Sequence, residues 1–355
     1  MSRARSMTFL SAMRDLQWRR RRVIIAAVGA ALVFSITLVL AGVSNGFDVE
    51  TDDTMDRFGT DGWVVGEGAA GPFIGQKPLP EALVDAVRAD PGITDANPVI
   101  FSRKTVGTDS PEEVNLFGAA LDGVGVPAPD DGRGLEAVGE IVVSGELDYD
   151  VGDEILVSEE PFEVVGTISE WTAVAGVPNV MITIEDAQRL SFLDQPIISA
   201  IAVSGDPDAL PDGLEFMSDD VAREDLLRAV ENARAGINLV GFLLWIVAGT
   251  IIGSLLYLSA LERMHDFAVF KATGTSSVVV LVDLVFQAVF IALVSATIGM
   301  IVAALVGPRF PTPVVIPLRS LVSLPLVAVA VGLLASLAGL RRAVTVDPAV
   351  AFNKA

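Results

Sequence analysis

Residues Val23–Val43 read VIIAAVGAALVFSITLVLAGV, an apolar run of 21 residues without a charged side chain. A helix needs about 20 such residues to cross the hydrocarbon core of a bilayer, because each residue adds about 1.5 Å along the axis. Three further runs of this kind occupy Ile237–Leu261, Val278–Val306 and Leu321–Leu340. The sequence therefore predicts an α-helical membrane protein with four transmembrane helices, one separated from the other three by a long polar block.

The first run has a second interpretation as a cleaved signal peptide, because Val39-Leu40-Ala41 resembles a cleavage site. Its apolar core of 21 residues is longer than the roughly 7–15 residues of a signal peptide. We therefore expect an uncleaved anchor, with the cleaved form as the alternative. The topology of the remaining chain is the same under both interpretations.

The charges are distributed unevenly along the chain. Residues 44–236 hold 40 of the 45 acidic residues and 10 of the 24 basic ones, a net charge of −30. The segment before the first run carries Arg3, Arg5, Arg14 and Arg19–Arg22 against a single acidic residue, Asp15. Because basic residues accumulate on the cytoplasmic side of membrane spans, we expect a multi-pass protein of the plasma membrane with both termini in the cytoplasm and the acidic block outside.

These signals divide the whole chain into expected segments. Helical spacing of apolar residues next to the arginine run favours an amphipathic helix at Met7–Trp18, on the inner leaflet. In chain order the segments are a cytoplasmic amphipathic N-terminal helix (1–22), the first span (23–43), the extracytoplasmic domain (44–236), the second span (237–261), a cytoplasmic helix (262–277), the third span (278–306), an outer loop (307–320), the fourth span (321–340) and a cytoplasmic tail (341–355).

The acidic block is expected to form an α+β domain. Pro80–Ala89 has the apolar spacing of a helix, and four stretches rich in β-branched residues are typical of strands. The predicted strands are Glu140–Val143, Glu154–Val157, Phe162–Ile168 and Val180–Ile184. Gly118–Gly134, rich in Pro, Gly and Asp, is predicted to link two subdomains. Because the chain has no cysteine, the domain depends on its own core rather than on disulfides.

Both ends of the acidic block are predicted to continue the neighbouring spans as helices. No strong helix breaker follows the first run until Gly59. Asp219–Gly236 begins with capping aspartates and runs straight into the second span. Its predicted apolar face comprises Val221, Leu226, Leu227, Val230 and Ala233. The two extensions predict a helical stalk between membrane and domain.

Small residues recur at every fourth position in the last three apolar runs, a spacing that lets helix backbones approach closely. The set comprises Gly249, Gly253, Ser295, Gly299, Ala303, Ala328 and Gly332. We predict helix packing at these positions, within one chain or across a dimer, with chance in an alanine-rich sequence as the alternative. Asp283, one turn from Gln287, is either a functional intramembrane carboxylate or an interfacial group with a basic partner.

Signatures of catalysis are missing from the sequence. It contains no phosphate-binding P-loop motif, no HExxH motif, no cysteine and one histidine, His265. Little therefore remains for a transition-metal site or a nucleophilic triad. The acidic stretch Asp148–Glu154 lacks the spacing of a calcium loop, which favours a turn over a calcium site. We expect a non-catalytic chain with no metal or cofactor of its own and no nucleic-acid partner.

The segment between the second and third runs reads ERMHDFAVFKATGTS, from Glu262 to Ser276. It is predicted to form a short amphipathic helix that Gly274 ends, because it is too hydrophobic for a solvated turn. Its apolar face consists of Met264, Phe267, Ala268 and Ala272. His265 is expected to be solvated or at an interface rather than chemically active.

This segment resembles the motif ERxxEIGILKAxGAS, which joins the second and third spans of FtsX/MacB-type ABC transporter permeases. The matching residues are Glu262, Arg263, Lys271, Ala272, Gly274 and Ser276, and Asp266 keeps the acidic character. The departures are Phe267 and Phe270 for aliphatic residues, Ala268 for glycine and Thr275 for alanine. VSGELDYDVGDEILVSEEPFEVVGTI (residues 143–168) and VDPAVAF (Val346–Phe352) resemble the family's external strand pair and its tail. The length and the Phe-Ala-Val variant bring the chain nearest to the DevC- and HrtB-like permeases.

The resemblance implies an architecture and partners. Members have one span, a large MacB-like external domain and three further spans. They act with a separate cytoplasmic ATP-binding subunit, two copies per permease homodimer, which binds ATP and Mg; membrane lipids surround the permease. Helix 262–277 would be the coupling helix that contacts this ATPase. The residues expected to couple are Glu262, Arg263, Asp266, Phe267, Phe270, Lys271 and Gly274.

The resemblance also implies a function. Such a permease couples ATP hydrolysis on its partner to a conformational change outside the cell, called mechanotransmission, and exports or extracts a hydrophobic or amphipathic substrate. A lipid, a peptide, a drug or haem would fit this description. The alternatives are an FtsX-like transmembrane scaffold that regulates an extracellular cell-wall hydrolase, and a membrane-anchored sensor that acts without an ATPase.

Overall fold

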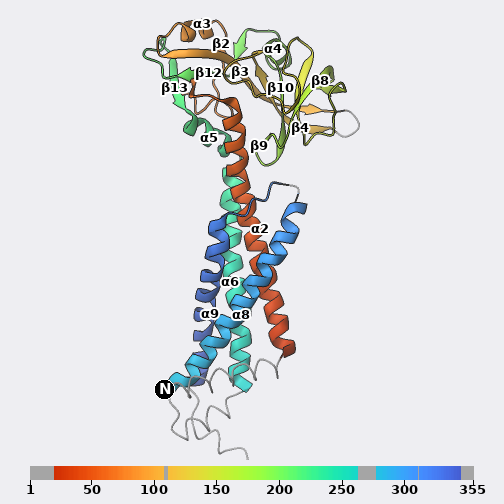
Figure 1. Ribbon diagram of the computed structural model, residues 1–355. Coiled ribbons are helices and arrows are strands. Elements are labelled where there is room, and N and C mark those ends of the chain that lie inside the picture. The colour runs from red at the N-terminus through yellow and green to blue at the C-terminus, as the bar shows by residue number, and fades with distance from the viewer. Residues whose placement is uncertain (1–19, 108–110, 263–276, 311, 345–355) are drawn as a thin grey trace, which may run out of the picture. The chain divides into compact units, whose positions relative to one another are not determined.

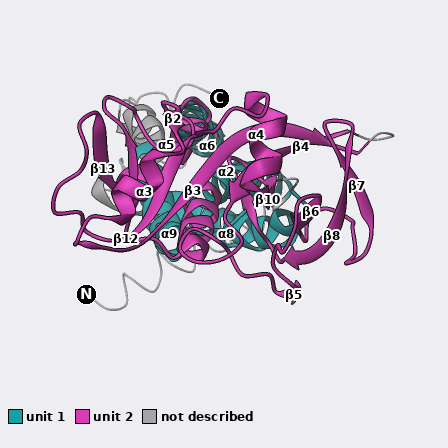
Figure 2. Cartoon of the chain, turned by 90° about the horizontal axis from the view of Figure 1, so that it is seen from above, with its two compact units in different colours: residues 1–45, 235–310, 314–355 teal, residues 46–234, 311–313 magenta. Residues whose placement is uncertain are grey.

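The structure is a computed structural model that describes residues 20–107, 111–262, 277–310 and 312–344. The chain divides into two compact units, which Figure 2 colours separately. Unit 1 comprises residues 1–45, 235–310 and 314–355, and unit 2 comprises residues 46–234 and 311–313. In the described part of the chain, unit 1 consists of helices, whereas unit 2 contains a β-sheet with short helices.

Long helices form unit 1 (Figure 1). They are α2 (Arg20–Phe58), α6 (Glu231–Glu262), α8 (Ser277–Val306) and α9 (Leu318–Val344). A 3-10 turn, η1 (Gly307–Arg309), follows α8 directly. Two of the helices extend beyond unit 1, because residues 46–58 of α2 and 231–234 of α6 belong to unit 2. α2 ends directly before Gly59, whose φ of +60° is incompatible with a continuing right-handed helix.

Among the residues that the structure describes, three helices are long and apolar enough to cross a membrane. The candidate spans lie at Val23–Phe58, Glu231–Leu255 and Val285–Arg309. In α9 the apolar stretch within the described side chains is shorter, Leu318–Leu334, and contains Pro325. The structure therefore supports a membrane protein with three candidate spans, and the fourth span stays a prediction.

Small side chains form much of the interior of unit 1. On α8, Ala288, Ala292 and Ala296 repeat every fourth residue and are fully or almost fully buried. They belong to a cluster with Phe34 of α2 and Leu324 of α9. Lipid is as apolar as these side chains, so their close van der Waals packing, rather than exclusion of water, holds the bundle together.

Unit 2 is organised by a mixed, 11-stranded sheet, in which nine strands follow the order β13-β1-β12-β3-β4-β10-β6-β8-β5. Off this path, β7 pairs with β3 and β8, and β9 pairs with β10; β2 and β11 form a separate two-stranded sheet. The longer strands are β1 (Gly62–Gly66), β3 (Ile93–Val106), β4 (Glu112–Ala119), β6 (Glu140–Ser144), β7 (Glu154–Val157), β8 (Glu160–Ile168), β10 (Val177–Thr183), β12 (Ala200–Gly205) and β13 (Leu214–Ser218). The two-residue strands are β2 (Leu79–Pro80), β5 (Asp131–Gly132), β9 (Thr172–Ala173) and β11 (Ile197–Ile198). The helices are α3 (Leu83–Arg88), α4 (Ile184–Phe192) and α5 (Asp219–Arg228). β10 runs parallel to β4 and β6 parallel to β8, and the other pairs are antiparallel.

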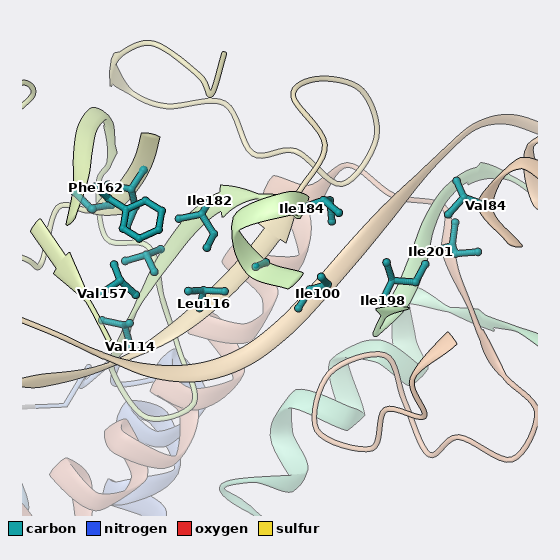
Figure 3. Close-up of a cluster of buried hydrophobic side chains, with 14 of the residues drawn as sticks. Val84, Ile100, Val114, Leu116, Val157, Phe162, Ile182, Ile184, Ile198 and Ile201 are labelled. Carbon is teal, nitrogen blue, oxygen red and sulfur yellow. The ribbon is translucent and has the colours of Figure 1, made fainter. Parts of the chain in front are cut away.

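The 14-residue strand β3 connects the two halves of the sheet. Its first half pairs with β12, where Val99 lies opposite Ala200, and its second half pairs with β4 from Ile100 to Val106. The core side chains of both halves therefore form one cluster, which Figure 3 shows from Phe162 at one end to Val84 at the other. α4 packs on this cluster through Ala187, which lies where a side chain at Gly118 would be: a Cβ there would come within 2.3 Å of Ala187 Cβ.

The structure departs from several sequence predictions in unit 2. The predicted strand Val180–Ile184 corresponds to β10, which begins at Val177 and ends at Thr183, because Ile184 starts α4. The predicted helix Pro80–Ala89 begins only at Leu83, because Leu79–Pro80 pairs with β11. The predicted linker 118–134 lies within one compact unit, since β3 carries the sheet across both halves. The predicted helix Asp219–Gly236 is interrupted after Arg228: the Val230 amide donates to Leu227 O at 3.1 Å, a tight turn, before α6 begins at Glu231.

Candidate functional site

The predicted coupling segment lies between two described helices. α6 ends at Glu262 and α8 begins at Ser277. Glu262 is thus the last residue of α6, whereas the other coupling residues lie outside the described residues, as does His265. They are Arg263, Asp266, Phe267, Phe270, Lys271 and Gly274. The N-terminal amphipathic helix and the Val346–Phe352 motif lie outside the described residues as well.

Gly299 lies where α8 approaches the backbone of α2. A Cβ built on Gly299 would come within 2.9 Å of Ala31 O, 3.0 Å of Phe34 Cβ and 3.1 Å of Ser35 N. Two of these atoms are main-chain atoms, so they cannot move aside without shifting α2. On the same helix, Ser295 and Ala303 are fully buried, and Ser295 Oγ donates to Ile291 O at 2.7 Å. These positions place α8 in backbone contact with α2.

Gly332 allows α9 to approach the backbone of α8 closely. Its Cβ would come within 3.1 Å of Ala288 C and O and 3.2 Å of Val289 Cα. Ala328, one turn earlier on α9, is fully buried. The small residues of α8 and α9 thus let three helices meet at backbone distance.

The GxxxG pair of α6 lies in a different setting. A Cβ at Gly249 would meet only Val331 Cγ1, at an ordinary 3.7 Å. Gly249 and Gly253 instead line an apolar groove of about 800 Å³ together with residues of α6 and α9. Large side chains of α6 are exposed over much of its length, among them Leu239, Phe242 and Leu243 at 50–62%. α6 therefore leaves an apolar face open in the single chain.

In unit 2, Asp225 of α5 holds a loop through its carboxylate. Asp225 is fully buried, and it accepts hydrogen bonds from the amides of Phe73 and Ile74, each at 2.8 Å, and of Gly75 at 2.9 Å. A Cβ at Gly71 would lie 2.1 Å from Asp225 Cγ, so glycine is needed for this approach. We call this arrangement of Asp225 with residues 71–75 the Asp225 clamp.

The clamped loop contributes Phe73 to a cluster of aromatic rings. The members are Phe58, Trp63, Phe73, Phe101, Phe117 and Trp171, with neighbouring ring centroids 4.9–6.1 Å apart. Trp63 is also tied to α5, because its indole Nε1 donates to Asp219 Oδ1 at 2.9 Å. The cluster therefore joins α5, the last residue of α2 and the sheet into one packed joint.

Ion pairs connect α5 with residues 46–58 of α2. Arg223 lies 2.5 Å from Asp52 Oδ1 and 2.6 Å from Asp56 Oδ1, and Arg234 pairs with Asp48. Arg223 thus bridges two carboxylates one helical turn apart. The Arg223 side chain is 24% exposed, whereas Asp52 and Asp56 are 58% and 71% exposed, so solvent screens these ion pairs much as it does other surface pairs.

Glu50 of α2 binds a turn with strained backbone. Its carboxylate accepts from the amides of Gly176 at 2.7 Å and Ala175 at 3.2 Å. Val174 and Ala175 have φ values of +57° and +72°, a region that a β-branched residue rarely adopts. The nearby Thr54 hydroxyl donates to Thr172 O at 2.7 Å. Contacts from α2 therefore hold this turn in a conformation that it would not favour alone.

Two family models match this chain, and together they cover most of it. The MacB-like periplasmic core domain matches residues 23–216, and the FtsX-like permease C-terminal domain matches residues 238–348. The chain belongs to the FtsX/MacB family of ABC transporter permeases.

Curated relatives of this permease align with it over nearly its whole length. ABC transporter permease Rv2563 of Mycobacterium tuberculosis is 45% identical over 345 residues, covering 97% of this chain and 99% of the relative. Permease Rv0072 of the same organism is 42% identical over 348 residues, with the same coverage. The periplasmic region of MacB from Actinobacillus actinomycetemcomitans aligns at a TM-score of 0.35 and 14% identity, covering 49% of this chain and 96% of that one. The family assignment rests on the family models and sequence relatives.

In the sheet domain of the permease, the carboxylate of Glu140 is strongly perturbed by its neighbours. Arg133 Nη2 lies 2.5 Å from Glu140 Oε1, and the amides of Glu136 and Ala137 donate to Glu140 Oε2. The Arg133 hydrogen bond, reinforced by these amides, lowers the pKa of Glu140 to about 2. This pair fixes the 133–140 loop and has no sign of a catalytic role.

Sequence analysis missed the Asp225 clamp and the aromatic cluster. The predicted apolar face was wrong in part: Ala233 is exposed and Val221 and Leu227 are half-buried, whereas Ala222 and Asp225 are buried beside Leu226 and Val230. Asp225 stands in a run of acidic residues and has no local signal that separates it from them. Its burial depends on a loop about 150 positions earlier in the chain, which only the fold brings near.

Proposed function

We propose that this chain is the transmembrane subunit of an ABC transporter that couples ATP hydrolysis by separate ATP-binding subunits to movement of its extracytoplasmic sheet domain. ATP and Mg would bind to those partners, because this chain lacks a P-loop motif. Glu262, Arg263, Asp266, Phe267, Phe270, Lys271 and Gly274 would contact the ATPase. The family membership supports the class of protein, and the site assignment is our own.

The continuity of α6 carries the proposal. This helix extends without interruption from Glu262, where the coupling segment begins, to Glu231, and its 32 residues correspond to roughly 48 Å. One short turn separates Glu231 from α5, which bears Asp225 and the partners of Trp63. A displacement of α6 by the ATPase would therefore act directly on the Asp225 clamp and the aromatic cluster.

We further propose that two copies of the permease meet through α6. The groove at Gly249 and Gly253 and the exposed Leu239, Phe242 and Leu243 are an extended apolar face on a helix with little cover in the single chain. The GxxxG spacing would allow a second α6 to approach closely there. The homodimer would bind two ATPase subunits.

The proposed activity is export or extraction of a hydrophobic or amphipathic substrate on the extracytoplasmic side. The arginines before the first span support this direction, because they favour a cytoplasmic N-terminus, and we propose four spans with both termini in the cytoplasm. Regulation of a cell-wall hydrolase by the same movement is the competing function, and it predicts ATPase coupling without transport.

Reconstituted complexes test the coupling. The ATP-binding subunit is assayed alone, with the wild-type permease, and with the Phe267→Asp or Glu262→Lys variants. We expect the wild-type permease to stimulate ATP hydrolysis. With either variant the rate should fall to that of the ATPase alone, because Phe267→Asp places a charge on the apolar face and Glu262→Lys reverses a charge. His265→Ala, in the same segment, is the matched control and should retain stimulation.

The outcomes separate the hypotheses. Full stimulation by both variants would overturn the coupling assignment while leaving the family intact. Loss of stimulation together with unchanged efflux of lipophilic compounds from cells, but altered cell-wall hydrolysis, would favour the signalling scaffold.

A further inference from the structure

A second pocket in unit 1 lies between α2, α6 and α9; it shares Trp245 with the GxxxG groove, whereas Gly241 lines this pocket and not the groove. It has a volume of about 330 Å³. Its lining comes from α2 (Thr37, Leu38, Leu40 and Ala41), from α6 (Ile237, Asn238, Gly241, Phe242 and Trp245) and from α9 (Ser320, Ser323 and Leu324). Small-molecule sites commonly have this size, with mostly apolar walls and few polar groups.

The pocket lies at one end of the helical bundle. Ala41 is two residues from the end of the apolar run Val23–Val43, Ile237 begins the second run, and Ser320 directly precedes the fourth. All three helices thus line the pocket at the level where their apolar segments meet the polar side. This is the boundary between acyl chains and headgroups in a bilayer.

Two polar side chains of the pocket make no hydrogen bond within the described part of the chain and are accessible, because Asn238 is exposed and Ser320 is half-buried. The Asn238 amide and the Ser320 hydroxyl have no hydrogen-bond partner there, whereas Thr37 Oγ1 donates to Val33 O at 2.9 Å and Ser323 Oγ to Ser320 O at 3.3 Å. The accessible amide and hydroxyl can therefore donate hydrogen bonds to ester or phosphate oxygens of a molecule bound in the pocket.

A cation is held at the polar end of the pocket. Arg319 directly precedes Ser320, and its Nη2 donates to Asn45 Oδ1 at 3.4 Å. Asn45 lies one helical turn beyond Ala41 and is itself fixed, because its Nδ2 donates to Val315 O at 3.1 Å. The guanidinium therefore lies about one turn, roughly 6 Å, beyond the pocket along α2. In a chain of net charge −21 this arginine is a local positive site.

The geometry points to a lipid-binding site: we infer that this pocket takes one acyl chain of an anionic phospholipid from the extracytoplasmic leaflet, with the phosphate next to Arg319 and the glycerol ester region next to Asn238 and Ser320. An apolar pocket, unpaired polar groups at its rim and a cation one turn further out match the order of groups along such a lipid. The inference deepens the proposed function by naming a substrate class, and binding itself requires no ATPase.

Gly241 provides a way to close the pocket without disturbing the bundle. A Cβ on Gly241 meets no atom within 4 Å, so a larger side chain there would extend into open space along the pocket wall. Gly236, five residues earlier on α6, is equally unobstructed but does not line the pocket, which makes Gly236→Leu a matched control.

Trp245 provides the readout, because its indole lines the pocket and packs against Phe34 at 5.6 Å between ring centroids. Full-length protein in detergent is titrated with lysophosphatidylglycerol that carries a brominated acyl chain, which quenches nearby indoles. The same chain on a choline headgroup and the glycerophosphoglycerol headgroup without a chain are the comparison probes. The Trp245→Phe variant identifies the part of the quenching that comes from this residue.

We expect saturable quenching of Trp245 by the anionic lysolipid, about fivefold weaker binding of the choline lipid, and none of the isolated headgroup. Arg319→Gln should remove the fivefold preference, whereas Arg309→Gln, in the same loop, should keep it. Gly241→Leu should abolish saturable quenching and Gly236→Leu should not. Circular dichroism and gel filtration establish that each variant is folded.

Quenching that rises linearly with lipid, is equal for both headgroups and is unchanged in folded Gly241→Leu would overturn the inference, since it would report partition into the micelle. A change of oligomeric mass in Gly241→Leu with unchanged lipid binding would also overturn it and assign the pocket to a protein contact. Loss of ATPase coupling in Phe267→Asp leaves this binding assay unaffected, so the two proposals fail separately.

Discussion

Replacement of Asp225 by asparagine tests the joint between α5 and the sheet domain. In the wild type, one carboxylate oxygen accepts the amides of Phe73 and Ile74, and the other accepts the amide of Gly75 with Arg228 at 3.4 Å. Asparagine keeps one of these oxygens and puts an NH₂ donor in place of the other. At least one of these three amides, each buried or partly buried, then faces a donor and loses its partner.

The magnitude follows from these contacts. A buried donor left without an acceptor costs about 1–3 kcal/mol, and the remaining bonds lose the strengthening that an ionised acceptor provides. We therefore expect a loss of about 2–4 kcal/mol in the free energy of unfolding of the sheet domain. For a domain of this size each kcal/mol lowers the melting temperature by about 2–4 °C, so the shift should be roughly 5–15 °C.

Thermal unfolding of the full chain in detergent measures this effect, followed by near-UV circular dichroism because Trp63 and Trp171 lie in the aromatic cluster. Glu224→Gln is the matched control: it makes the same chemical change on the exposed side of the same helix and should shift the midpoint by less than about 2 °C. If the unfolding midpoint of Asp225→Asn equals that of Glu224→Gln, the clamp does not hold the loop and the reasoning is refuted.

Three further outcomes are expected. Gly299→Ala should destabilise the helical unit by about 1–3 kcal/mol in detergent unfolding, because its Cβ meets α2 backbone, whereas Gly249→Ala should be neutral or stabilising; equal effects would contradict the close contact. Because the pKa of Glu140 is about 2 when folded and near 4.5 when unfolded, its contribution to stability should be complete above about pH 4.5 and lost as the pH falls through 2. A stability gap between wild type and Glu140→Gln that stayed constant from pH 5 to about 2 would exclude this linkage. Glu50→Ala should accelerate amide hydrogen exchange at residues 174–176, and Asp53→Ala, exposed on the same helix, should not; unchanged exchange in Glu50→Ala would show that the turn holds itself.

The sequence by itself determined the class of this protein. Apolar length is a local property, so Val23–Val43 and the later runs indicated a membrane protein without reference to any contact. The family motif was equally readable, because its residues are contiguous between Glu262 and Ser276, and the family models agree with it. Strand Glu154–Val157 was also found with the correct bounds, because its alternation and flanking turns are local signals.

Tertiary structure alone decided which residues are buried with a specific partner, which lie at close helix contacts and which line a pocket. Of the many carboxylates in residues 44–236, Asp225 is buried and clamped because a loop about 150 positions away returns to it. Gly249 and Gly299 have the same small-residue spacing in sequence, yet only Gly299 meets a neighbouring backbone, since spacing says nothing of which helix lies opposite. The lipid pocket likewise requires three helices whose lining residues lie about 80 to 280 positions apart. Local pattern is set by adjacent residues, whereas burial, partnership and cavities depend on which distant segments the folded chain brings together.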